Sequence, residues 1–213
     1  MLSQTRRFAV LEPPCSPSLS PEEEFRLIFA DYPSELVGAV ARKEQKRQSS
    51  DWIYGEINDL HTLQSVIRAI QQRHNGLLGL RSESFYDLGS GSGRPCIAAA
   101  LCHPFRACKG IEINPDLFEI SQLVAQKWHG FHKKSEIEID FILGSFLDHK
   151  YCEWTEGDLV FVNSTCFTPQ TVACLAEIAS VMKKGAFIVT LSHPLPVSSG
   201  FAVLEELRFP MSW

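Results

Sequence analysis

Apolar residues recur at two spacings along this chain of 213 residues, and the spacings predict two kinds of element. From residue 84 onward, short runs dense in apolar residues are typical of buried strands. Between them, apolar residues return every three or four positions, as on helices that bury one face. This alternation predicts an α/β fold, a mostly parallel sheet with helices on both faces. Strands are predicted at residues 84–88, 107–113, 137–143, 159–163, 186–191 and, as a last candidate, 201–209, and helices at 94–101, 115–128 and 169–182.

The chain before residue 58 has a different character. Prolines interleaved with serines over residues 12–20 indicate a linker, so residues 1–20 are predicted to be disordered or a linker. The run Ser20-Pro21-Glu22-Glu23 then has the features of a helix start, because serine caps free amides and acids stabilise the positive end of the helix dipole. Further helices are predicted at 34–48 and 58–75. We therefore expect a helical extension over residues 21–57 and the main domain over 58–213.

The composition limits the classes of ligand. Apolar residues make up 45% of the chain and charged residues 21%, which supports a core of ordinary size. The net charge of −5 argues against a protein that holds nucleic acid by bulk electrostatics. A local basic patch at residues 42–47 is the one candidate for such a contact, and a solvated helix face is the simpler interpretation of it. No apolar run reaches the roughly 18 residues of a membrane span.

The cysteines and histidines predict no metal site. The seven cysteines are odd in number and scattered, which favours a reduced intracellular compartment in which most pack as small hydrophobic side chains. His129 and His132 lie near each other, but no second pair of ligands accompanies them. We therefore expect a nuclear or cytoplasmic protein. Arg6 and Arg7, in a start without acids, leave a mitochondrial presequence as an alternative.

The clearest chemistry follows the predicted strand 84–88. There the run Gly89-Ser90-Gly91-Ser92-Gly93 leads into a helix that begins near Arg94. Glycines let the chain turn sharply and let a ligand approach the backbone, and a helix start presents free amides to that ligand. Alone, such a loop indicates only an α/β fold with a small ligand, because many α/β folds need tight turns.

Two carboxylates narrow the ligand of this glycine loop. Asp87 stands directly before the loop, where it would repel a pyrophosphate but suits the cationic methionine end of S-adenosylmethionine. Glu112 ends the next predicted strand, where its two oxygens can accept both ribose hydroxyls. The glycines also read Gly-x-Gly-x-Gly, whereas dinucleotide sites read Gly-x-Gly-x-x-Gly. We predict S-adenosylmethionine as the cofactor, and a nicotinamide dehydrogenase is the rival that fits less well.

Taken together, several motifs resemble the disruptor of telomeric silencing family over residues 52–213. In order, they are Trp52-Ile53-Tyr54-Gly55-Glu56, the loop 87–93, Gly110-Ile111-Glu112, Leu159-Val160-Phe161-Val162-Asn163 and Cys166-Phe167-Thr168-Pro169. That family consists of class I methyltransferases without a SET domain that act on a lysine of the nucleosome surface. The resemblance implies a class I, Rossmann-like methyltransferase fold. It also implies a protein-lysine N-methyltransferase whose partner is a protein substrate, a histone or nucleosome.

The resemblance further implies a cofactor site built from several segments. Residues 54–56 would close over the methionine end of the cofactor, and the glycine loop would hold that end from below. Glu112 would bind the ribose, and residues 145–146 would face the adenine. The implied cofactor-binding residues are Tyr54, Gly55, Glu56, Asp87, Gly89, Ser90, Gly91, Gly93, Arg94, Glu112, Ser145, Phe146 and Asn163.

The residues implied in catalysis are Asn163, Tyr54 and Phe167. Asn163 would stand beside the transferred methyl, at a strand end where open α/β sheets bind ligands, and Phe167 would wall the channel of the substrate lysine. Methyl transfer is an in-line displacement on a sulfonium that needs positioning and desolvation, so a catalytic triad is not required. Glu56 is one candidate for the group that takes the proton of the substrate ammonium.

Several positions depart from the family pattern. Ser145 stands where the family has an acid near the adenine, Ile57 replaces a threonine, and Ser164 replaces the second asparagine of a pair. The family's basic tail has no counterpart. Met211-Ser212-Trp213 resembles the start of the family's final strand, and the sequence stops there. We therefore expect the sheet to lack a full antiparallel strand between 186–191 and 201–209, which leaves strand edges unpaired.

Three functions remain open at this point. The first is a nucleosomal histone-lysine methyltransferase. The second is a methyltransferase for a non-histone protein or for RNA, which the net charge and the missing basic tail favour. The third is a methyltransferase-fold binding module without turnover, which Ser145 and the missing strand motivate. Contact with nucleic acid is expected to be indirect or through a local patch, and the sequence makes no prediction of the oligomeric state.

Overall fold

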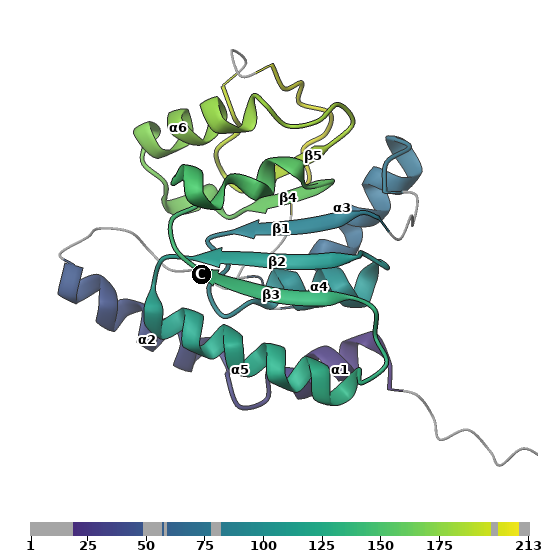
Figure 1. Cartoon of the computed structure of the whole chain (residues 1–213), viewed down its shortest axis with the longest axis vertical. Coiled ribbons are helices and arrows are strands. Elements are labelled where there is room, and N and C mark those ends of the chain that lie inside the picture. Colours follow the sequence, from purple (N-terminus) through teal and green to yellow (C-terminus); the bar gives the residue numbers. More distant parts are fainter. Residues whose placement is uncertain (1–18, 49–56, 58, 78–81, 197–199, 209–213) are drawn as a thin grey trace, which may run out of the picture.

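A five-stranded parallel sheet forms the centre of the protein in a computed structural model that describes residues 19–48, 57, 59–77, 82–196 and 200–208 (Figure 1). The strands are β1 (Ser84–Leu88), β2 (Ala107–Glu112), β3 (Glu138–Leu143), β4 (Leu159–Val162) and β5 (Phe187–Thr190). Their order is β3-β2-β1-β4-β5, so the chain builds outward from β1 to β3 and then returns to β4 on the other side. Open α/β sheets bind ligands at this reversal, at the carboxyl ends of β1 and β4.

Among the described residues, three helices precede the first strand, and the others connect the strands. They are α1 (Pro21–Ile28), α2 (Ser34–Gln48), α3 (Leu60–Arg73), α4 (Arg94–Cys102), α5 (Pro115–Phe131) and α6 (Pro169–Ala179), with the 3-10 helices η1 (His149–Glu156) and η2 (Ser164–Cys166). The predicted alternation of strands and helices is confirmed. The sequence pattern missed η1, which starts where the Asp148 side chain accepts a hydrogen bond from the Lys150 amide. A 3-10 helix this short has no long apolar period that would reveal it.

The two faces of the sheet bury separate apolar clusters, because successive side chains of a strand point to opposite faces. On one face, Phe85 of β1 and Cys108 of β2 pack with residues of α3, α4 and α5. On the other face, Tyr86 packs with Trp154 of η1 and Leu175 of α6. Helices therefore cover both faces, as predicted.

The helical extension packs directly on the main domain. Phe25 of α1 lies in the same cluster as α3 and α4, and Val37 of α2 packs against Leu117 of α5. In Figure 1, α1 and α2 accordingly lie beside α5. As predicted, Ser20 starts α1, and it forms a reciprocal capping box with Glu23. The extension thus shares the core of the sheet domain.

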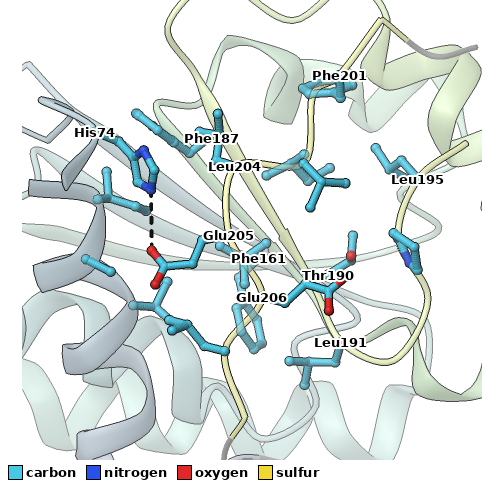
Figure 2. Close-up of a pocket in the computed structure, with 18 of the residues that line it drawn as sticks. His74, Phe161, Phe187, Thr190, Leu191, Leu195, Phe201, Leu204, Glu205 and Glu206 are labelled. Carbon is cyan, nitrogen blue, oxygen red and sulfur yellow. Dashed lines mark hydrogen bonds and ion pairs between the residues drawn. The ribbon is translucent and has the colours of Figure 1, made fainter. Parts of the chain in front are cut away.

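The prediction of a strand at residues 201–209 is wrong over its described part. Residues 201–208 form no strand and instead line, with β5 and α3, a cavity of about 490 Å³ (Figure 2). Glu205 pairs with Arg73 and with His74, whose Nε2 lies 3.4 Å from the carboxylate. A strand needs a backbone ladder to its neighbour, and these side-chain contacts hold the segment on α3 instead. Within the described residues, the sheet ends at β5.

Three features of the sequence lie outside the described residues. They are the presequence-like start with Arg6 and Arg7, the Trp52–Glu56 motif, and the ending Met211-Ser212-Trp213. Among the residues that the structure does describe, no helix has both the length and the apolar composition of a membrane span.

The described cysteines are free thiols, and Cys96 and Cys108 are buried. Burial raises the pKa of both Cys96 and Cys108 well above the ordinary value, and it raises the pKa of Cys102 to about 12. Because the thiolate is the reactive form, burial and a raised pKa both suppress reaction. The prediction that cysteines pack as small hydrophobic side chains is confirmed for Cys96 and Cys108.

We predict that iodoacetamide at neutral pH alkylates Cys174 in the folded protein and spares Cys96 and Cys108, because only Cys174 is exposed among these three. Mass spectrometry of the peptides before and after unfolding measures this. Labelling of Cys96 or Cys108 as fast as Cys174 without denaturant would contradict the packing described here.

Candidate functional site

Four of the predicted site residues meet at one edge of the sheet. Asp87 lies in β1, Glu112 ends β2, Ser145 follows β3 and Asn163 follows β4. Because all of these strands are parallel, their carboxyl ends face the same side. The sheet therefore brings together residues that are far apart in the sequence.

The glycine loop turns over the end of β2 through left-handed backbone conformations. Gly89, Gly91 and Gly93 have φ of 83°, 53° and 88°, a region that residues with a side chain rarely adopt. The amides of Gly89 and Ser90 both donate to the Ile111 carbonyl, at 2.9 and 3.1 Å. The loop is thus tied to the neighbouring strand at the point where a ligand would approach.

Glu112 joins the glycine loop to the start of α5. Its side chain is only 6% exposed, and its two oxygens accept hydrogen bonds from the amides of Gly91 and Asn114, each at 2.7 Å. A carboxylate oxygen has two acceptor positions, so these bonds are compatible with accepting ribose hydroxyls as well. Asn114 in turn caps α5 by accepting from the amides of Asp116 and Leu117.

Asp87 is the second buried carboxylate beside the loop. It is 1% exposed and lies between Gly110 of β2 and Phe161 of β4 in the sheet register. Burial raises the pKa of Cys96 in α4 well above the ordinary value, and the nearby Asp87 carboxylate raises that pKa further. Two buried acids beside one loop would repel a pyrophosphate and would attract a cation.

Gly110 has a steric role that was not predicted from the sequence motifs. A Cβ atom on this residue would lie 2.6 Å from the Ser90 side chain and 2.6 Å from the Phe141 ring. Both neighbours are buried in the core, so neither has room to move away. The glycine before Ile111-Glu112 could have been recognised from the sequence as the place where the loop meets β2, since close backbone approach requires glycine.

The helix start after the loop has no side-chain cap. Gly93 is the N-cap of α4, and a glycine has no side-chain oxygen to accept from the first amides. These amides and the helix dipole favour an anionic group at this position. Arg94 is the first residue of α4, and its guanidinium contacts Phe25 of α1 and Tyr32 in the following turn. Its role in binding the cofactor stays a prediction.

The segment after β3 carries the residues predicted to face the adenine. The carbonyl of Phe146 accepts a hydrogen bond from Trp154 Nε1 at 2.9 Å, and Ser145 Oγ accepts one from the Leu147 amide at 3.3 Å. The Phe146 ring stacks on Phe167, with ring centres 5.4 Å apart. Phe146 and Phe167 thus form one aromatic wall between the predicted adenine and substrate sides.

The segment after β4 is fastened to the segment after β5. Asn163 caps η2 by accepting from the Thr165 amide at 3.4 Å. Ser164 is buried, and its hydroxyl lies 2.5 Å from the Leu191 carbonyl and 3.2 Å from that of His193. The serine that departs from the family pattern thus holds the loop that positions Asn163.

Two exposed apolar residues at the same edge were not predicted as site residues. Ile113 follows Glu112 and is 61% exposed, and Leu143 ends β3 and is 43% exposed. Large apolar side chains beside the buried acids suit a flat apolar ring in the ligand. In the sequence, they are marked only by their position, Leu143 as the last residue of β3 and Ile113 directly after β2. Tyr54, Gly55 and Glu56 lie outside the described residues, and their roles stay predictions.

The sequence of this chain matches one known protein family over most of its length. The family described as "Histone methylation protein DOT1" matches residues 35–202, well over half of the chain. The chain belongs to the DOT1 family. The family resemblance predicted from the motifs is therefore confirmed.

Individual relatives of this DOT1-family chain are longer proteins. A relative from Cryptococcus neoformans, named "Histone-lysine N-methyltransferase, H3 lysine-79 specific", is 29% identical over 82% of this chain and 25% of its own length. A Drosophila melanogaster protein of the same name is 29% identical over 61% of this chain and 7% of its own length. The chain thus spans a quarter or less of these relatives.

Solved structures similar to this DOT1-family chain include an S-adenosylmethionine-dependent methyltransferase from Thiobacillus denitrificans in complex with S-adenosyl-L-homocysteine. It is 19% identical, with a TM-score of 0.45 over 70% of this chain and 54% of its own. A methyltransferase from Methanococcus maripaludis is 14% identical, with a TM-score of 0.43 over 84% of this chain and 67% of its own.

We predict that Gly110→Ala lowers the free energy of unfolding by about 1–3 kcal/mol, because the added methyl overlaps Ser90 and Phe141 in a packed core. Gly130→Ala in α5 is the matched control, since nothing lies near its Cβ position. Alanine there should leave the stability unchanged or raise it by up to about 1 kcal/mol. Urea unfolding measures both variants, and equal stabilities would contradict the close approach at Gly110.

Proposed function

We propose that this chain is an S-adenosylmethionine-dependent protein-lysine N-methyltransferase that acts on a histone of the nucleosome, and therefore works in the nucleus as a chromatin regulator. The observation that carries the proposal is the pair of buried carboxylates, Asp87 and Glu112, on either side of a left-handed glycine loop in a chain of the DOT1 family. The shared names of the relatives support a histone as the acceptor.

The residues present fit the proposed cofactor. S-adenosylmethionine supplies a methyl group on a sulfonium cation when it is bound. Asp87 places a negative charge beside the cationic end, and the uncapped first turn of α4 offers amides to a carboxylate. Glu112 offers both oxygens to ribose hydroxyls, while Ile113 and Phe146 offer apolar surface to the adenine.

The residues that the structure describes on the acceptor side of the proposed site, Asn163 and Phe167, carry no charge. Asn163 and Phe167 flank η2, and their position at the end of β4 is where an amine would reach the cofactor. An amide side chain can orient the amine by hydrogen bonds without adding charge, and an aromatic wall excludes water from it. Such a site favours transfer to a neutral nitrogen.

The first test is cofactor binding by calorimetry. S-adenosylmethionine should bind the unaltered protein, and Asp87→Asn and Glu112→Gln should each weaken binding about tenfold or more, because each removes a buried charge from the ligand's partners. Glu138→Gln is the matched control, because this acid is exposed and begins β3, at the end of the strand away from the proposed site. No binding by the unaltered protein would overturn the proposal.

The second test identifies the acceptor. Labelled cofactor is mixed with nucleosomes, free histones, protein extract or total RNA, and we expect label on a histone of the nucleosome. Label confined to RNA or to another protein would replace the substrate in the proposal. Binding of the cofactor without label on any acceptor would indicate a binding module instead of an enzyme.

The role of Asn163 is testable separately from the structure of its loop. Asn163→Ser keeps an oxygen that can cap η2 but loses the amide group, so we predict a kcat lower by about tenfold or more with a similar melting temperature. Thr165→Ser, which keeps its hydroxyl in the same loop, is the control. An unchanged kcat for Asn163→Ser would remove Asn163 from the acceptor site.

A further inference from the structure

The Arg94 side chain connects the cofactor loop to the helical extension. Arg94 is only 4% exposed, although it directly follows the glycine loop. One terminal nitrogen of its guanidinium donates to the Tyr32 carbonyl at 2.7 Å. The guanidinium carbon also lies 4.5 Å from the centre of the Phe29 ring and 6.0 Å from that of Phe25. Phe25 lies in α1, and Phe29 and Tyr32 lie in the turn after it.

A buried cation at this position is costly without such partners. The first turn of a helix carries the positive end of the dipole, which disfavours a positive side chain. Removing a guanidinium from water costs further free energy unless its hydrogen bonds are replaced. The Tyr32 carbonyl and the Phe29 ring offset both costs, because a guanidinium binds carbonyl oxygens and aromatic faces. These contacts therefore stabilise the buried Arg94 side chain while the extension is docked.

We propose that Arg94 is a positioning residue that makes cofactor binding depend on the docked extension. The amide of Arg94 belongs to the first turn of α4, and Gly93, directly before it, closes the loop by donating to the Ser90 carbonyl at 2.8 Å. When α1 separates from α4, the guanidinium loses its contacts with Tyr32, Phe29 and Phe25, and the first turn of α4 is held less firmly. This inference rests on the proposed cofactor site and adds a second element, residues 21–33, to what that site needs.

Lys127 supplies a matched comparison on the same part of the extension. Its ammonium lies 2.5 Å from the Asp31 carboxylate, 3.3 Å from the Ile28 carbonyl and 5.2 Å from the centre of the Tyr32 ring. Like Arg94, Lys127 is a cation that contacts a backbone carbonyl and an aromatic ring at the end of α1 or in the turn after it. Lys127 lies in the later part of α5, whereas Arg94 directly follows the glycine loop. None of the contacts described for Lys127 involves that loop.

Calorimetry with S-adenosylmethionine on the full chain tests the proposal. We expect Arg94→Met to weaken binding about tenfold, since a charged hydrogen bond and its ring contact are lost, and Lys127→Met to change it by less than about twofold. Phe29→Leu, a milder change that keeps apolar volume, should weaken binding by about threefold and add little to Arg94→Met, because the two side chains act through one contact.

Amide hydrogen exchange distinguishes this coupling from a purely structural role of Arg94, because a purely structural role would not make exchange in the extension depend on the cofactor. If the extension and the cofactor are coupled, the cofactor must stabilise the extension to the same degree that the extension stabilises cofactor binding. S-adenosylmethionine should therefore slow amide exchange over residues 21–33 in the unaltered protein and in Lys127→Met. The effect should be absent from Arg94→Met at saturating cofactor.

The outcomes separate this inference from the proposed function. Binding of S-adenosylmethionine with no change of exchange over residues 21–33 overturns the coupling and leaves the cofactor site intact. Equal losses of affinity in Arg94→Met and Lys127→Met would also overturn it, because general loosening of α1 would then explain both. If Arg94→Met does not fold, the exchange of the unaltered protein and the affinity of Phe29→Leu decide the question.

Discussion

The Glu112 carboxylate is the contact on which the candidate site depends. It accepts hydrogen bonds from the Gly91 amide in the glycine loop and from the Asn114 amide at the start of α5. One side chain at the end of β2 thereby joins a loop, a strand and a helix start. A buried carboxylate without such partners would be strongly unfavourable, so the loop must lie over β2 for the charge to be accommodated. The same charge then faces any ligand that enters between them.

The close approach of loop and strand explains where glycine is required. Gly110 lets Ser90 and Phe141 come within contact distance of the β2 backbone, and the three loop glycines take up left-handed conformations. The loop would otherwise stand away from β2, and the Gly91 amide would not reach the carboxylate. Ordinary turn glycines have no such steric requirement, which is why the geometry at Gly110 distinguishes this loop from a generic tight turn.

The two halves of the candidate site are supported by different contacts. The cofactor half is packed against α4 and, through Arg94, against the extension. The acceptor half depends on Ser164, whose hydroxyl joins the end of β4 to the segment after β5. The two halves meet at the stacked rings of Phe146 and Phe167.

Much of this arrangement followed from the sequence by itself. The alternation of apolar patterns determined the parallel α/β fold, and Asp87, the glycine loop and Glu112 indicated the ligand class, because these signals lie within one βαβ unit. Only the tertiary structure decided that Arg94 contacts the extension, that Ser164 fastens the loop of Asn163, and that residues 201–208 form no strand. Each of these depends on a partner distant in the chain, Tyr32, Leu191 and Arg73 respectively. Local patterns record which face a residue buries and carry no information about which distant residue it meets.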